Sequence, residues 1–238
     1  MISMSADKKH RRELTRFGEL PETVSFRIRE PGSALTHFIG LILFSIGAGP
    51  LLVKAKAAGG AVFAGICVYV AATCLLYAAS TTYHTVVTDR KRTTFFRKLD
   101  HVSISIMIAG TYTPICVTIL RECSGMYLLA AVWTLALLGV GMKMLWVTCP
   151  KWLSSLIYIA MGWLCVFAMK DIVTLMPAAA FLFLLSGGLF YTAGAVVYAM
   201  HPEKFDEKHI YFGSHEIFHV LIMLGTLCHF IVMYRFIV

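Results

Sequence analysis

The chain has 238 residues, of which 58% are hydrophobic and only 14% are charged, and its mean hydropathy is +0.76. A soluble domain has about half apolar and about a quarter charged residues, so this composition excludes an ordinary soluble enzyme. The formal net charge of +8 indicates a membrane topology and contact with anionic lipids. A nucleic-acid partner is not expected, because the short N-terminal tail is the only separate basic segment.

Residues 1–33 form the only long polar stretch, and we predict that they are a cytoplasmic N-terminal segment in which Ser33 caps the first membrane helix. A transmembrane domain is expected to span residues 34–238. It contains seven apolar runs, each close to the roughly 20 residues that a helix needs to cross a bilayer. They are Ala34–Val53, Ala61–Thr85, Asp100–Leu120, Met126–Trp146, Trp152–Met169, Ala178–Met200 and Gly213–Val238. The sequence therefore predicts an all-α membrane protein, a bundle of seven transmembrane helices.

Lysine and arginine are distributed unevenly between the two ends of these runs. If the spans alternate in direction, 16 of the basic residues fall on the side of the N-terminus and 5 on the other side. Cytoplasmic loops carry the positive excess, which predicts a cytoplasmic N-terminus and an external C-terminus. We expect a multi-pass protein of the cell membrane.

The seven cysteines are scattered along the chain, and none forms a CxxC motif. Most lie within the predicted spans, so we interpret them as small apolar packing residues. They are Cys67, Cys74, Cys116, Cys123, Cys149, Cys165 and Cys228.

Three histidines fall at the same end of the predicted spans. His84 closes the second span, whereas His215 and His219 open the seventh, so alternating directions place all three at one depth. Residues i and i+4 share a helix face, which allows His215 and His219 to chelate one ion. Ionisable groups within a membrane are costly and indicate function. Three neutral imidazoles and an open fourth position are typical of catalytic zinc, so these histidines are the predicted zinc ligands.

Asp100 and Ser80 are the predicted catalytic residues beside this metal. Asp100 opens the third span at the same face, and Ser80 precedes His84 by one helical turn. Asp100 is expected to orient or deprotonate a water on the zinc, and Ser80 to hold Asp100 or the substrate. The alternative interpretations are a helix N-terminal charge for Asp100 and an interfacial position for His84.

Two other histidines are weaker candidates for this site. His37 near the start of the first span is a possible outer neighbour of the ligands. His229 lies ten residues beyond His219, about 15 Å along a helix, which is too deep for the same ion.

These residues occur in segments that resemble the haemolysin III family, the bacterial branch of the progestin and adiponectin receptor superfamily. The resemblance covers nearly all of the spans and implies a seven-helix membrane protein with zinc near the cytoplasmic side. The motifs that carry it are Ser80-Thr81-Thr82-Tyr83-His84, Leu99-Asp100-His101, Ala109-Gly110-Thr111-Tyr112-Thr113-Pro114, Gly187-Gly188-Leu189-Phe190-Tyr191-Thr192-Ala193-Gly194 and His215-Glu216-Ile217-Phe218-His219.

The family's three metal ligands map onto His84, His215 and His219, and its serine and aspartate map onto Ser80 and Asp100. The superfamily is similar in these motifs to alkaline ceramidases, which implies hydrolysis of lipid amides. One departure is that many relatives have an asparagine in the stretch that here reads Glu30-Pro31-Gly32-Ser33-Ala34-Leu35-Thr36-His37. No role is therefore assigned to Glu30 or His37.

Four functions are compatible with these observations. The first is a zinc-dependent hydrolase that acts on an amide or ester of a membrane lipid. The second is a membrane receptor or sensor with a structural zinc. The third is an intramembrane metalloprotease, since His215 to His219 reads HExxH, but Glu216 points about 100° away from His215. The fourth is a haemolysin or channel, although few charged residues within the spans argue against a conduction path.

Overall fold

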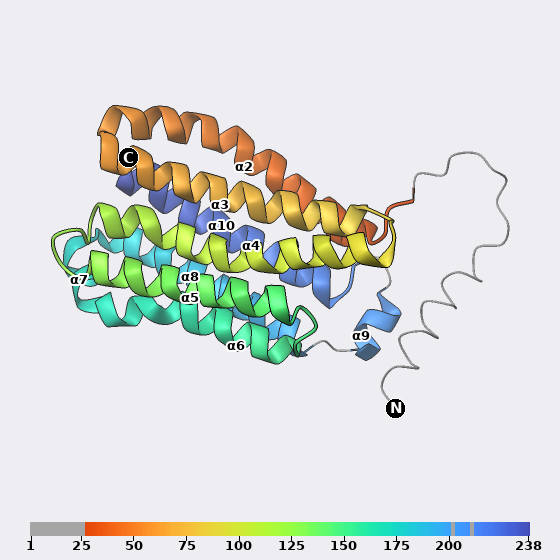
Figure 1. Cartoon of the computed structure of the whole chain (residues 1–238). Helices are drawn as coiled ribbons and strands as arrows, with labels where there is room; N and C mark the ends of the chain where they lie inside the picture. The colour runs from red at the N-terminus through yellow and green to blue at the C-terminus, as the bar shows by residue number, and fades with distance from the viewer. Residues whose placement is uncertain (1–26, 201–202, 210–211) are drawn as a thin grey trace, which may run out of the picture.

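The computed structural model describes residues 27–200, 203–209 and 212–238, which are helical almost throughout and contain no strand (Figure 1). The helices pack lengthwise into one elongated bundle. They are α2 (Pro31–Ala58), α3 (Gly60–Thr85), α4 (Arg90–Val117), α5 (Gly125–Leu145), α6 (Lys151–Gly162), α7 (Met169–Leu175), α8 (Ala178–Met200), α9 (Glu203–Lys208) and α10 (Ser214–Val232). A 3₁₀ helix (Trp163–Ala168) joins α6 to α7, and a π-helical turn (Met233–Ile237) follows α10.

Within the described ranges, six helical segments are long and apolar enough to cross a membrane. They are Pro31–Ala58, Gly60–Thr85, Gly125–Leu145, Lys151–Leu175, Ala178–Met200 and Ser214–Ile237. Many of their apolar side chains face outward rather than into the bundle; Leu145 is 91% exposed and Phe167 is 86% exposed. A surface of this kind is suited to contact with lipid.

The third predicted span does not appear among these six segments. Helix α4 begins at Arg90, ten residues before the predicted start, because Asp89 caps it by accepting a hydrogen bond from the amide of Arg92 (3.0 Å). Its first turns are therefore basic and lower its average hydropathy. The helix nevertheless packs along α3 on one side and α5 on the other.

The first helix also begins earlier than predicted. Pro31 occupies its first turn, a position that suits proline because the missing amide proton has no helical partner there. Glu30 is consequently the residue that precedes the helix, and Ser33 lies inside it. The prediction that Ser33 caps this helix is wrong.

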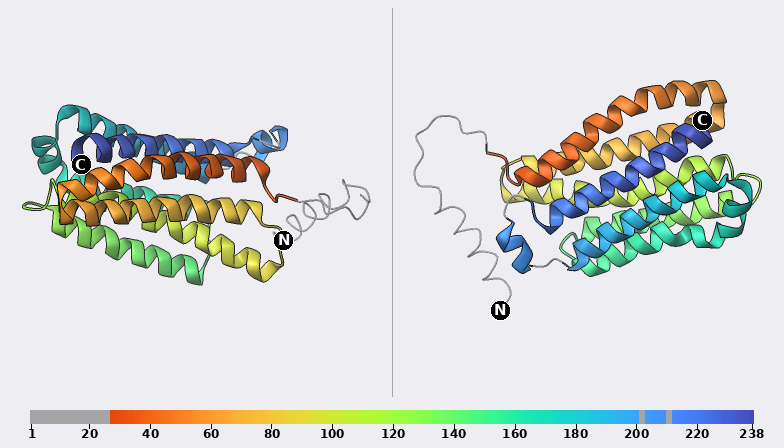
Figure 2. Two further views of the ribbon diagram at one scale, coloured as in Figure 1. Left: turned by 90° about the horizontal axis from the view of Figure 1, so that it is seen from above. Right: turned by 180° about the vertical axis from the view of Figure 1, so that it is seen from behind.

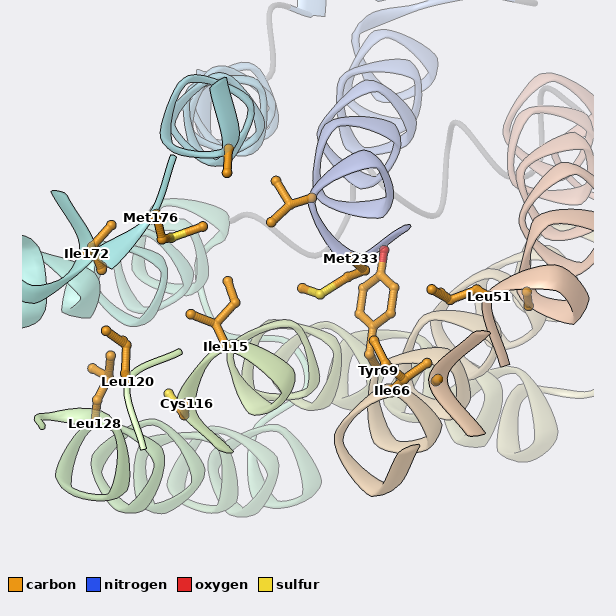
Figure 3. Packing of buried hydrophobic residues seen from close by; sticks show 14 of the residues in the cluster. Leu51, Ile66, Tyr69, Ile115, Cys116, Leu120, Leu128, Ile172, Met176 and Met233 are labelled. Carbon is orange, nitrogen blue, oxygen red and sulfur yellow. The ribbon is translucent and has the colours of Figure 1, made fainter. Parts of the chain in front are cut away.

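The two ends of the bundle differ in chemistry. The start of α2 and the C-terminus lie at opposite ends, as Figures 1 and 2 show. At the C-terminal end, Tyr69 and Ile66 of α3 pack with Leu51 of α2, and Met233 lies beside Tyr69 (Figure 3). Buried polar side chains, among them Ser33, His84 and His219, gather instead at the end of the bundle where α2 begins.

Candidate metal centre

The structure brings the three predicted histidines together at the end of the bundle where α2 begins. His84 lies in the last turn of α3, and His215 and His219 lie in the first turns of α10. One ring nitrogen from each lies within 4.8 Å of the others. His84 is 2% exposed and His219 is 1% exposed. A group of this geometry can hold a metal ion, and it joins two helices that are distant in sequence.

The hydrogen bonds of His219 fix its tautomer. Its Nδ1 lies 3.2 Å from the carbonyl oxygen of Ser33, which can only accept, so Nδ1 carries the proton. The same nitrogen lies 3.0 Å from the hydroxyl of Thr36. That hydroxyl directs its own proton to the carbonyl of Ser33 (2.9 Å) or Gly32 (3.1 Å), so it too accepts from the ring. The lone pair of His219 is therefore on Nε2.

Glu30 fixes the tautomer of His84 in the same way. The Nδ1 proton of His84 is donated to the Glu30 carboxylate. Partial burial opposes ionisation of that carboxyl, but the hydrogen bond from His84 and the positive charge of Arg29 hold the pKa of Glu30 below its ordinary value. Arg29 approaches the carboxylate at 3.5 Å and stacks over the ring of Tyr83 at 3.8 Å. A carboxylate that binds the far side of a histidine is common around zinc, because it orients the ring and increases its basicity.

The segment that carries Glu30 is held in place by its backbone. The amide of Glu30 donates to the carbonyl of His84 (2.9 Å), and the amide of Arg29 donates to that of Thr85 (3.3 Å). These bonds attach the chain before α2 to the end of α3. No periodic pattern in the sequence indicates this contact, since the segment precedes the helix.

The donor set fits a zinc ion. The Nε2 atoms of His84 and His215 face each other at 3.3 Å, and the Glu30 contact leaves a lone pair on Nε2 of His84. A cation between the rings would bind the Nε2 lone pairs of His84 and His219. Neutral imidazole nitrogens are typical zinc ligands, and three of them leave a fourth position for water or substrate.

His37 supports the ligands from α2, in agreement with its predicted position next to them. Its ring stacks on that of His219 with centroids 3.6 Å apart and an angle of 10° between the planes. The His37 ring also makes an edge-on contact with the ring of Tyr77, with centroids 5.2 Å apart. Among the described residues, helix α2 thus contributes no ligand but contacts His219.

Glu216 has a structural role instead of a catalytic one. The hydroxyl of Ser33 donates to one oxygen of this carboxylate, and the amide of Gly213 donates to the other at 2.8 Å. The side chain therefore closes the N-terminus of α10. This geometry argues against the metalloprotease interpretation, which requires Glu216 as the base.

Ser80 and Asp100 face a cavity of about 160 Å³ that His215 and His219 also line. Both are buried, and Asp100 interacts electrostatically with His84. The Ser80 hydroxyl lies close enough to the Asp100 carboxyl to interact with it. Two polar groups are therefore available to a molecule that reaches the histidines through this cavity.

The cavity is otherwise mostly apolar and follows the length of the bundle. On α4 its lining extends from Asp100 to Ile115, a separation of about 22 Å along a helix. It continues to Leu120 and Leu128 near the opposite end. His229 lines its middle but does not belong to the histidine group, which agrees with its predicted depth. A long apolar space with polar groups at one end is suited to a hydrocarbon chain with a polar head.

The sequence matches the model of the family described as haemolysin-III related over residues 26–230. It is 34% identical over 209 residues to Hemolysin-3 of Bacillus cereus, covering 87% of this chain and 91% of that protein. It is 33% identical over 208 residues to the Hemolysin-3 homolog of Bacillus subtilis (strain 168), covering 86% and 93% of the two chains. A shorter match, 49% identical over 51 residues, relates 20% of this chain to 16% of the ADIPOR-like receptor IZH1 of Eremothecium gossypii.

Proposed function

Because the chain belongs to the haemolysin III family of multi-pass membrane proteins, we propose that it is a zinc-dependent hydrolase of a lipid amide or ester. His84, His215 and His219 hold the ion, and Asp100 and Ser80 act on the substrate. The observation that carries this proposal is the histidine group at the polar end of a long apolar cavity.

The proposal includes a bundle of seven spans with the N-terminal segment, residues 1–33, in the cytoplasm. Helix α4 is the third span in chain order and brings the number to seven, and its packing along both α3 and α5 supports that assignment. The 16 basic residues on the side of the N-terminus support the orientation. The histidines then lie near the inner leaflet of the bacterial inner membrane.

A bound zinc polarises a carbonyl group and makes water a stronger nucleophile at neutral pH. The protein's own groups complete the site. Glu30 and the Ser33 carbonyl keep the ligand protons on Nδ1, so the Nε2 atoms stay available for the ion. Asp100 takes the proton of the attacking water, and the Ser80 hydroxyl, which lies beside Asp100, holds Asp100 or the substrate. The narrow apolar cavity excludes bulk water and accepts the acyl chain.

A membrane receptor or sensor is the second candidate function. The short match to an ADIPOR-like receptor favours it, as does the linkage of α3 to α10 by the three histidines. In that case the ion has a structural role, and ligand binding in the cavity replaces turnover.

The test is a hydrolysis assay with purified full-length protein and its Asp100→Asn variant. Ceramides and related acyl lipids are offered in micelles, with and without a chelator, and bound metal is measured in parallel. Asp100→Asn should retain zinc, because the histidines are unchanged, but lose about 10²–10⁴-fold in rate, the usual effect of removing a general base. Asp89→Asn is the matched control, since asparagine caps a helix as well as aspartate does.

Each outcome decides between the candidates. Activity that survives both the chelator and Asp100→Asn refutes the hydrolase mechanism. Bound zinc without hydrolysis of any lipid favours the receptor. Loss of zinc and stability together in Asp100→Asn means that Asp100 braces the fold and is not a catalytic residue.

A further inference from the structure

A second buried polar cluster lies in the connection between α5 and α6, at the same end of the bundle as the histidines. The ammonium nitrogen of Lys143, in the last turn of α5, lies 3.1 Å from Cys149 Sγ and 2.5 Å from Ser154 Oγ. The sulfur and that hydroxyl oxygen are 3.2 Å apart. Lys143 is 1% exposed and Cys149 is 6% exposed. None of these residues contributes to the proposed hydrolase.

The local backbone explains why these side chains meet. At the end of α5, the amide of Trp146 donates to the carbonyl of Met142 (2.7 Å). In the turn that follows, the backbone amide of Cys149 donates to the carbonyl of Trp146 (3.3 Å). Pro150 then directly precedes α6. The short connection folds back over the end of α5 and covers Lys143. The structure thus differs from the apolar packing role that the sequence suggests for Cys149.

The charge of Lys143 requires compensation. An ammonium group buried without an opposite charge is strongly destabilised. Among the described residues no carboxylate forms an ion pair with Lys143, and its hydrogen-bond partners are the thiol and the hydroxyl. Of these two groups, the thiol is the one that can carry a negative charge near neutral pH.

The other titratable groups around the sulfur do not provide this charge. Arg97 of α4 interacts electrostatically with Cys149 and adds a second positive charge. Tyr158 of α6 and Tyr198 of α8 also interact with the sulfur, but phenols are neutral at physiological pH. Burial opposes ionisation of the thiol, but the hydrogen bonds from Ser154 and Lys143 and the two positive charges lower the pKa of Cys149 below its ordinary value.

We infer that Cys149 is a thiolate paired with Lys143 at neutral pH, and that it is a nucleophilic site for covalent modification by peroxides and small electrophiles. With hydrogen peroxide, the sulfur attacks one oxygen, an S–O bond forms and the O–O bond breaks. The leaving hydroxide takes a proton to become water, the sulfur is oxidised by two electrons to a sulfenic acid, and the peroxide is reduced. Either modification leaves Lys143 without its counter-charge.

The consequence reaches the cavity, because the cluster adjoins its wall. Ser155, next to Ser154, and Tyr158 both line the cavity. Tyr158 also donates a hydrogen bond to the carbonyl of His101 on α4 (3.1 Å). Loosening the start of α6 therefore changes the wall of the space that the proposed lipid occupies.

The test is the pH dependence of alkylation, measured for each cysteine of the full-length protein in detergent. A short pulse of iodoacetamide is followed by digestion and mass spectrometry of the cysteine peptides. The sulfur displaces iodide as the S–C bond forms, and only the thiolate reacts. Each rate is divided by the rate of the same cysteine at pH 9, which removes differences in accessibility.

Cys123 is the internal control, because it is exposed and precedes the first turn of α5, whereas Lys143 lies in the last turn of that helix. An ordinary thiol loses about tenfold in rate for each pH unit below its pKa near 8.5. At pH 6.5 the normalised rate of Cys149 should exceed that of Cys123 by at least about tenfold. In Lys143→Met, the pH profile of Cys149 alkylation should coincide with that of Cys123. In Ser154→Ala, the Cys149 profile should lie between the wild-type Cys149 profile and the Cys123 profile.

A Cys149 profile that follows Cys123 in the unmodified protein overturns the inference, whatever the variants do. So does a Cys149 that remains unalkylated at pH 9, since a modification site must be accessible. If Lys143→Met does not fold, the wild-type comparison and Ser154→Ala still decide. The measurement is independent of zinc and of lipid hydrolysis.

Discussion

The contact between Glu30 and His84 gives the most quantitative prediction for the metal centre. In Glu30→Ala, the Nδ1 proton of His84 loses the acceptor with which it is paired in the structure. Leaving a buried donor unsatisfied costs about 1–3 kcal/mol. Loss of such an outer partner typically weakens metal binding by about 10–100-fold, which is about 1.4–2.7 kcal/mol and agrees with that cost. Glu30→Gln should weaken zinc binding by only about tenfold, because its side-chain amide oxygen can still accept the Nδ1 proton of His84.

The assay is a competition titration of zinc against a chromophoric chelator, combined with thermal unfolding. At a zinc concentration 100 times the wild-type Kd, the ion stabilises the folded protein by about 2.7 kcal/mol. A 100-fold weaker site leaves about 0.4 kcal/mol under the same conditions. Glu122→Ala is the control, since this carboxylate is 92% exposed and lies next to Arg121 in the turn before α5.

The reasoning is refuted if Glu30→Ala binds zinc within twofold of the wild-type affinity. It is also refuted if the stability difference is as large in the presence of a chelator as with zinc, because Glu30 would then stabilise the fold and not the ligand. A loss confined to the zinc-bound protein supports the role proposed for this carboxylate.

Three further predictions concern the ligands, the packing and the topology. His84→Ala should lose most of the bound zinc, whereas His229→Ala should keep it; full occupancy in His84→Ala, measured by metal analysis, contradicts the three-histidine site. Gly187→Ala should lower thermal stability by about 1–3 kcal/mol through overpacking, because its Cβ would lie 2.1 Å from the His229 ring. Gly188→Ala should be close to neutral, since nothing lies within 4 Å, and equal unfolding temperatures for the two variants contradict the packing. A reporter fused after Val238 should be active only outside the cytoplasm, and cytoplasmic activity overturns the orientation.

Much of the architecture is determined locally by the sequence. The apolar runs predict six of the membrane helices because hydrophobic length is a property of each segment alone. The spacing of His215 and His219 predicts a shared face because helical periodicity is also local. Helix α4 is an exception. It is capped by Asp89 and begins at Arg90, so basic turns precede the apolar run that starts near Asp100.

The environment of the candidate site depends on contacts that only the tertiary structure creates. Ser33 meets His219 across 186 positions, and Glu30 meets His84 across 54. The register of α2 beside α3 and α10 decides which carbonyl or carboxylate faces which ring nitrogen, and no periodic pattern encodes that register. The same holds for Lys143: the sequence shows a cation at a helix end, and the fold of the following connection buries it against a thiol. Composition and periodicity determine where the chain crosses the membrane, whereas packing between helices determines which polar groups lose water together, and so their protonation and reactivity.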